Sequence, residues 1–199
     1  MALTTEEVDI CNQALGKFGA KRFTFGDVTS TPSVLCLLHY PQTRDALLRS
    51  YQWRFAKDRS ALSTNGTPEF EWDYQFALPD DFLMMRSIYE NRFSEENLRS
   101  YALEGNLLLT NENSMQIRYI KKVTDTTEFD PLFTEVLILT LAIKLVIPLT
   151  GGGSGGLNME EKLRKELKIL IRDVRALDGQ ESNTTGQDNL ETWNDARYA

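Results

Sequence analysis

Cys36 and His39 are the residues whose types and spacing come closest to a reactive pair. They lie three positions apart, so on a helix they would share one turn, as a thiolate beside its base or as two metal ligands. A structural zinc site needs about four ligands. His39 is the single histidine of the chain, so Cys11 and a carboxylate would have to complete the set. The pattern favours buried, reduced thiols without a metal or cofactor; a cysteine-dependent enzyme that uses Cys36 and His39 is the alternative.

A second candidate is a row of carboxylates in the middle of the chain. Glu69, Glu71 and Asp73 alternate with aromatic residues, so on a strand the three acids would share one face. Two carboxylates on one face are conceivable as a hydrolytic pair. The alternation is more typical of a solvated face opposite an aromatic core face, which predicts Trp72 and Tyr74 as core residues.

Residues 151–156 form a glycine-rich run, GGGSGG, that matches three phosphate or nucleophile motifs by letters. A dinucleotide fingerprint and a nucleophile elbow both need a preceding strand, whereas a helix is predicted there. Leu157 stands where a P-loop requires lysine, and the elbow needs a histidine later in the chain, whereas His39 lies upstream. The run predicts a flexible linker between two helices.

The charge of the chain limits its partners. With 22 Lys and Arg against 29 Asp and Glu, the net charge is −7, which argues against a protein that grips nucleic acid over a broad face. A regulatory DNA-binding protein is therefore the weaker alternative. The β region does carry basic residues, but without the dense aromatic platform of single-strand binders. They are Arg86, Arg92, Arg99, Arg118, Lys121 and Lys122.

Two helices are predicted before residue 57. The first opens with a capping box of Thr4 and Glu7 and ends at Gly19; Cys11 and Leu15 lie on its apolar face. The second opens at residues 31–32, Thr-Pro, and runs toward residue 55.

Pro41 and two aromatic residues add detail to the second helix. Pro41 lies inside its pattern and should kink or split it. Trp53 and Phe55, at its end, are predicted core residues.

Two more helices follow residue 126. One opens at Asp130-Pro131 and is stopped by Pro148. It is apolar nearly all round, so it is either central among helices or pressed between subunits, and we expect no membrane span. The last helix, over residues 159–177, has a narrow leucine stripe that packs on a partner helix.

Between these helix pairs the period changes to that of strands. Short aromatic and β-branched runs are separated by turn residues, including Pro79, and Gly105 supplies a hairpin turn. Sequential hairpins imply an antiparallel sheet. The predicted strands cover residues 59–63, 70–78, 83–90, 99–103, 107–110 and 115–123.

The predicted fold class is α+β. Residues 1–56 and 126–177 form a helical bundle of about four helices, and residues 57–125 form an antiparallel β insertion between helices two and three. Residues 178–199 form an extended, mostly acidic tail that carries Leu190, Trp193 and Tyr198. Apolar anchors on a polar tail are typical of a segment that orders on a partner; a frayed terminus is the alternative.

Eight segments spread along most of the chain carry a family resemblance. They are residues 11–19 (CNQALGKFG), 44–56 (RDALLRSYQWRFA), 72–81 (WDYQFALPDD), 101–105 (YALEG), 119–120 (YI), 130–133 (DPLF), 141–142 (LA) and 148–151 (PLTG). In order and spacing they resemble the tail tubular protein A family of podoviruses, which are phage head-to-tail adaptors. The glycine run at residues 151–156 departs from the family pattern.

The resemblance implies a structural protein of the virion rather than an enzyme. Such adaptors form a ring, typically dodecameric, under the portal protein at the head-tail junction. The ring continues the DNA channel and supports the next tail component, a nozzle or stopper, while DNA passes through the lumen without specific binding. The C-terminal segment of related adaptors reaches toward the portal, which here suggests Leu190, Trp193 and Tyr198. A stopper or other connector of a different phage lineage is the closest alternative.

Overall fold

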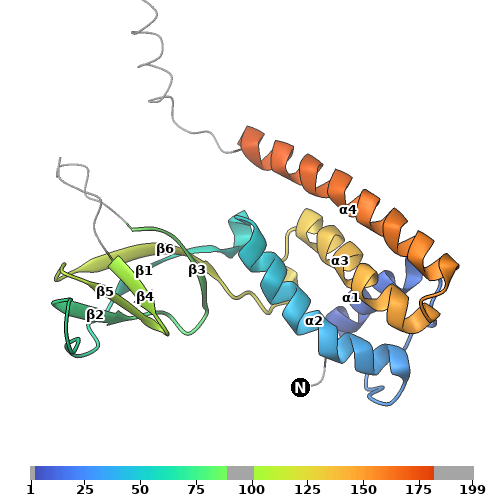
Figure 1. The fold of residues 1–199 in the computed structure, drawn as a ribbon, viewed down its shortest axis with the longest axis horizontal. Coiled ribbons are helices and arrows are strands. Elements are labelled where there is room, and N and C mark those ends of the chain that lie inside the picture. The colour runs from blue at the N-terminus through green and yellow to red at the C-terminus, as the bar shows by residue number, and fades with distance from the viewer. Residues whose placement is uncertain (1–2, 89–100, 182–199) are drawn as a thin grey trace, which may run out of the picture.

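The computed structural model describes residues 3–88 and 101–181, which contain four α-helices and two three-stranded antiparallel sheets. The helices gather at one end of the molecule and the strands at the other (Figure 1). The helices are α1 (Thr5–Gly16), α2 (Thr31–Ser50), α3 (Pro131–Thr150) and α4 (Ser154–Glu181). The strands are β1 (Lys57–Leu62), β2 (Tyr74–Ala77), β3 (Phe82–Ile88), β4 (Tyr101–Glu104), β5 (Leu107–Thr110) and β6 (Met115–Lys121). The mixed class is confirmed.

Local capping signals placed the start of α1 correctly. The Thr4 amide donates to the Glu7 carboxylate at 2.9 Å, and the Glu7 amide donates to the Thr4 hydroxyl at 3.3 Å. The helix ends at Gly16, three residues before Gly19, whose φ of 74° closes the following turn. The apolar face buries Leu15 completely.

The second helix ends earlier than predicted and is not split. Pro41 lies inside α2, which runs without interruption to Ser50. Trp53 and Phe55 lie beyond it, on the segment that leads into β1. Trp53 is nonetheless a core residue, and its indole N–H donates to the Leu47 carbonyl at 3.0 Å. Phe55 is only partly buried.

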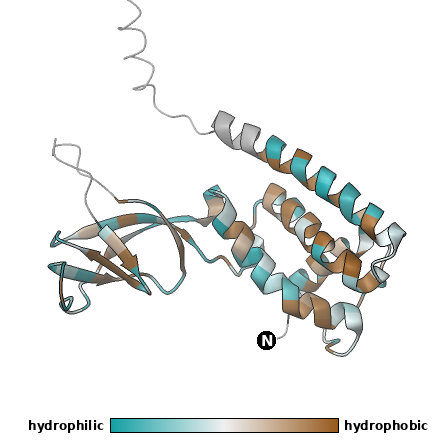
Figure 2. Cartoon of the chain, in the orientation of Figure 1, coloured by the Kyte–Doolittle hydropathy of each residue, from teal (hydrophilic) through white to brown (hydrophobic). Residues whose placement is uncertain are grey.

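Helix α3 is the centre of the helical part. It begins as predicted, with the Asp130 carboxylate accepting from the Leu132 amide at 2.7 Å. Its nine buried residues pack among α1, α2 and α4, and Figure 2 shows it hydrophobic along most of its length. Of the two alternatives for this helix, the structure agrees with a central position among helices, because three helices of the same chain pack on it.

Composition alone would also allow α3 to cross a membrane. It is the one helix in the described ranges that is long and apolar enough. The nine residues that it buries against the protein agree with the predicted buried helix.

The glycine run is a tight helix-to-helix turn rather than a flexible linker. Pro148 is accommodated in the last turn of α3, and Gly151 ends that helix in the left-handed region at φ 79°. Gly156 already lies in the first turn of α4. A Cβ atom there would overlap the hydroxyl of Thr150, so the close approach of α3 and α4 requires glycine at this position.

The sheets use pairings between distant segments. Only β4 and β5 form the predicted sequential hairpin, with Gly105 at φ 59° in its turn. Strand β6 lies between β1 and β3, and β5 lies between β2 and β4. The prediction of sequential hairpins was therefore wrong for the rest of the region, although every pairing is antiparallel.

Strand β6 links two hydrophobic cores. Met115, Ile117 and Tyr119 face Phe76 and other residues of the second sheet, and together they form a small core between the sheets. The next residue, Ile120, is fully buried in the helical core instead. Because one strand contributes to both cores, the sheets are fixed to the helical part.

The predicted aromatic face around residues 69–74 is wrong. Glu71 has a φ of 71°, a conformation that a strand cannot contain, so β2 starts only at Tyr74. Phe70 is 77% exposed and Tyr74 is 36% exposed, while Trp72 and Pro79 are half-buried. The carboxylates are solvated, but they do not lie opposite a core face.

An aromatic cluster closes the junction where the chain leaves and re-enters the helical part. Phe133 contacts Trp53, Phe55 and Phe129 with ring centroids 4.9–5.0 Å apart. Trp53 and Phe55 precede β1, whereas Phe129 and Phe133 follow β6. The cluster therefore joins the two connections between helices and sheets.

Replacing Trp53 by alanine should lower the free energy of unfolding by about 3–5 kcal/mol, because it opens a cavity in this cluster. Phe70→Ala is the matched control and should change it by no more than about 0.5 kcal/mol, because Phe70 is exposed. Urea titration followed by circular dichroism measures both. Equal effects of the two substitutions would contradict the junction role of Trp53.

Candidate interaction surfaces

The two thiols meet inside the protein. Cys11 on α1 and Cys36 on α2 are free and fully buried. A hydrogen bond between the thiols, together with burial, raises the pKa of Cys11 far above its usual range. His39 is half-buried on the same helix as Cys36, and its carbonyl accepts the Thr43 hydroxyl at 2.6 Å. The prediction that both cysteines are buried is confirmed, and they are not joined by a disulfide.

A buried ion pair lies beside the thiols. The Arg44 guanidinium on α2 is 3.6 Å from the Glu7 carboxylate on α1, and both residues are buried. Asp45 contacts Arg44 at 2.8 Å and Lys122 at 2.9 Å. Burial raises the pKa of the neighbouring Tyr40 hydroxyl, whose ring lies under Arg44. These groups hold α1, α2 and the end of β6 together and offer no opening to a substrate.

The other predicted chemical candidates do not assemble into a site. Glu69, Glu71 and Asp73 are exposed, on a segment that is not a strand. Within residues 3–88 and 101–181, no group of three or more His, Cys, Asp or Glu residues is arranged to hold a metal ion.

Exposed apolar side chains occur on the first half of α2 and on the loop before it. We call this the α2 surface; it consists of Phe25, Val28, Val34 and Leu38, which are 62%, 57%, 47% and 56% exposed. Val34 and Leu38 are one helical turn apart and share a face. The Asp27 carboxylate accepts from the Thr29 and Ser30 amides at 2.9 and 3.1 Å, and the Asp27 carbonyl accepts from the Ser33 hydroxyl, which joins the loop to the first turn of the helix.

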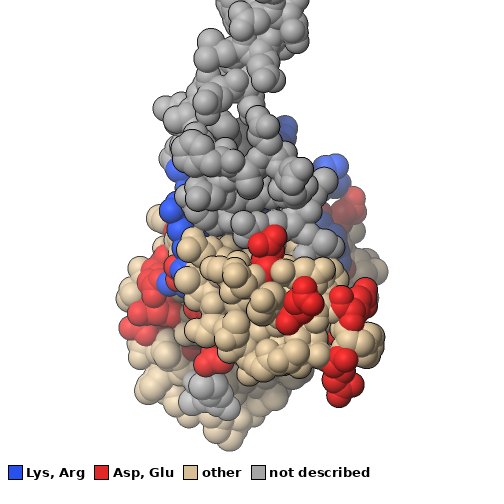
Figure 3. Space-filling model, turned by 90° about the vertical axis from the view of Figure 1, so that its left-hand side faces the viewer, with Lys and Arg blue, Asp and Glu red and all other residues tan. Residues whose placement is uncertain are grey.

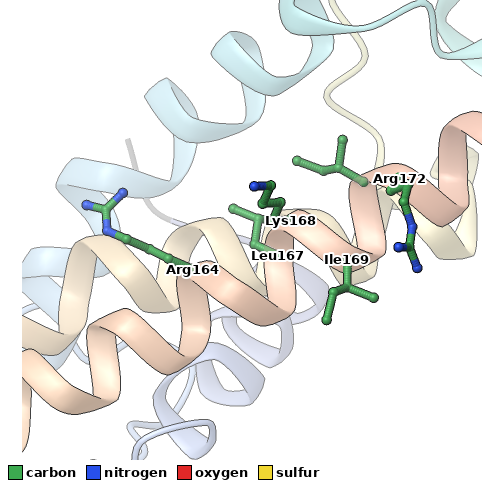
Figure 4. A pocket seen from close by; sticks show the side chains of 6 residues that line it. Arg164, Leu167, Lys168, Ile169 and Arg172 are labelled. Atoms are coloured by element: carbon green, nitrogen blue, oxygen red, sulfur yellow. The ribbon is translucent and has the colours of Figure 1, made fainter.

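A second open surface follows α4. Figure 4 shows Arg164, Lys168 and Arg172 projecting from the helix, with Leu167 and Ile169 between them. These residues line a groove of about 560 Å³, and Ile169 is 54% exposed. The predicted stripe does pack on α3, through buried Leu163 and Val174 and partly buried Leu167 and Leu170.

Charge is unevenly distributed over the sheet end. Figure 3 shows Asp and Glu side chains around an uncharged centre, with Lys and Arg toward the upper edge. The outer side of the sheet β1-β6-β3 holds a depression of about 390 Å³. We call it the basic depression; it is lined by Lys57, Arg59, Arg86 and Arg118, with Asp58 as its acidic member among the described residues.

The predicted portal-binding residues and two of the basic residues noted in the sequence are not among the residues that the structure describes. Leu190, Trp193 and Tyr198, together with Arg92 and Arg99, lie outside the described residues. Sequence reasoning noted Arg86 and Arg118 but missed Lys57 and Arg59. Alternation along residues 57–59 was the available signal, since it places Lys57 and Arg59 on one strand face.

The folded protein should not react with iodoacetamide at about pH 8, where a free thiol is partly ionised. Burial and the raised pKa keep Cys11 protonated, and Cys36 is equally enclosed. After denaturation in guanidinium both of the two cysteines should be alkylated, as mass spectrometry will show. Fast labelling of Cys36 in the folded chain would instead support a cysteine-dependent enzyme.

Comparison with known proteins gives no match: no protein-family model fits the sequence, and no curated protein is significantly similar to it. The function therefore has to be inferred from the side chains themselves. In the described part of the chain the thiols are closed off, whereas apolar side chains on α2 and α4 and basic side chains on the sheet β1-β6-β3 line open surfaces. Such surfaces are typical of proteins that bind other macromolecules.

Proposed function

We propose that this protein is a structural head-to-tail adaptor of a tailed bacteriophage. It forms a ring between the portal and the next tail component and continues the DNA channel. The observation that carries the proposal is the α2 surface, where four large apolar side chains are about half exposed or more. The family resemblance of the sequence supplies the identity of the neighbours.

The α2 surface supports a ring when it contacts a different patch of the next copy, rather than the same patch as in a two-fold dimer. A contact between one patch and a different patch of the next copy is heterologous, and such contacts close into rings when the rotation allows. The exposed side of α4, with Ile169 at its centre, is the second patch in this scheme. Covering Leu38 and Ile169 together would remove both from water.

The proposal also includes the finer architecture. Residues 1–56 and 126–177 act as one helical bundle that carries the subunit contacts, and residues 57–125 are an insertion that projects from it. Residues 178–199 reach the portal through Leu190, Trp193 and Tyr198. The ring is dodecameric by resemblance to the tail tubular proteins, and the protein belongs to the virion.

Burial of the thiols favours this structural role over a cysteine-dependent enzyme. A nucleophilic cysteine must be partly exposed and ionised, whereas Cys36 is fully buried. A stopper or connector of a different phage lineage would use similar helices and differ in its neighbour, so the portal to which the protein binds distinguishes the two.

The proposal is tested by mixing the purified chain with the portal of the same phage and imaging the product by negative-stain electron microscopy. The wild-type chain should add a ring to the portal. Leu38→Glu should prevent the ring, because it places a charge in the subunit contact.

A chain that ends at residue 177 should stay folded and fail to dock, because it lacks the portal-binding tail.

Leu103→Glu is the matched control, since Leu103 is also exposed, at 43%, but lies on β4. It should assemble like the wild type. Rings that form equally well with Leu38→Glu would contradict the role of the α2 surface. Full docking of the truncated chain would contradict the role of the tail.

A further inference from the structure

The basic depression on the sheet β1-β6-β3 concentrates positive charge in a protein whose net charge is −7. Arg118 lies in β6 between buried Ile117 and Tyr119, so its side chain points away from the core between the sheets. Arg59 in β1 is its direct partner in the antiparallel ladder. Lys57, two residues earlier in β1, shares the same face.

This arrangement is unfavourable for the isolated protein. Directly opposite residues of an antiparallel pair have Cβ atoms about 4.5–5.5 Å apart, and like charges at such positions destabilise the sheet. If this face of the sheet only had to be soluble, an acidic residue opposite Arg118 would stabilise the sheet more than Arg59 does. The like-charged pair of Arg59 and Arg118 therefore indicates a ligand that compensates it.

An irregularity in β3 adds a third guanidinium. Met85 pairs with Tyr119 and Ser87 pairs with Arg118, so Arg86 is an extra residue in β3. Bulges of this kind redirect side chains and occur beside functional sites. Here Arg86 and Ser87 both line the same depression as Arg118.

The four basic side chains have no ion-pair partner in the described ranges, whereas their neighbours do. Lys121 pairs with Glu128 at 3.0 Å, and Lys122 pairs with Asp45 at 2.9 Å. The acid inside the depression, Asp58, accepts the backbone amide of Arg59 at 2.7 Å. With four basic groups against this one carboxylate, the depression keeps a net positive charge that an external anion can approach.

We infer that the basic depression binds the phosphates of a nucleic-acid backbone, without reading its sequence. Guanidinium groups bind phosphate oxygens through two parallel hydrogen bonds. Cations carried by three adjacent strands, about 5 Å apart, form a row that suits a repeating anion better than a single small one. This site is additional to the proposed ring, for which DNA passes through the lumen without specific binding, and it is present in a single chain.

The expected affinity is modest and strongly dependent on salt. Neutralising four phosphates of a duplex would give a slope of about −3 to −4 in a plot of log K against log salt concentration. The probe is a short fluorescein-labelled DNA duplex of random sequence, and its anisotropy is measured with the full chain at low salt, without portal.

Arg59→Glu is the decisive variant, because it creates an oppositely charged pair with Arg118. Binding should fall at least tenfold while the melting temperature stays the same or rises, since the cross-strand repulsion has been removed. Lys168→Glu on α4 is the control with the same charge change, and its new acid lies between Arg164 and Arg172. It should alter DNA binding by less than twofold.

Four results would overturn the inference. The first is unchanged binding by Arg59→Glu, and the second is equal loss with Lys168→Glu, which would reflect overall charge alone. The third is displacement of DNA by a polyglutamate peptide at equal charge concentration, which would favour an acidic protein segment as the ligand. Inorganic phosphate should compete only at far higher concentration, and competition at the same concentration would reduce the site to a small-anion site.

Discussion

The fold depends on the need to remove the apolar side chains of one helix, α3, from water. Helix α3 has nine buried residues and packs among α1, α2 and α4, which removes its side chains from water. The first two of these helices precede the strands in the chain and the last follows α3, so the chain must return to where it left. The sheets consequently lie at one end of the molecule, and Trp53, Phe55, Phe129 and Phe133 close the junction.

Two further features determine which surfaces remain open. The buried Arg44–Glu7 pair and the contact of Asp45 with Lys122 fix α2 against α1 and β6. Breaking such a buried pair leaves an uncompensated charge, so the pair opposes a rotation of α2 that would bury Leu38, which is 56% exposed. The exposed apolar face of α2 and the basic face of the sheet support the proposed structural role.

Local signals were readable in the sequence, and contacts between distant segments were not. The Thr4–Glu7 capping box, the Asp130 cap and the Gly105 turn depend on a few neighbouring residues, and each was predicted correctly. Pairing of β6 with β1 and β3 depends on the two cores that the strand joins, which no short pattern encodes. The basic depression was predicted only in part: Arg86 and Arg118 were noted, whereas their position beside Lys57 and Arg59 depends on that pairing and on the extra residue Arg86.

Hydroxyl-radical footprinting of the free chain and of the chain bound to portal tests the central claim most directly. In the free chain, Phe25 and Leu38 should be oxidised, since they are 62% and 56% exposed, whereas Phe133 of α3 should be protected. In the portal-bound ring, Phe25 and Leu38 should become protected while Phe133 stays unchanged. Continued oxidation of Phe25 and Leu38 in the bound form, or oxidation of Phe133 in the free chain, would contradict the account.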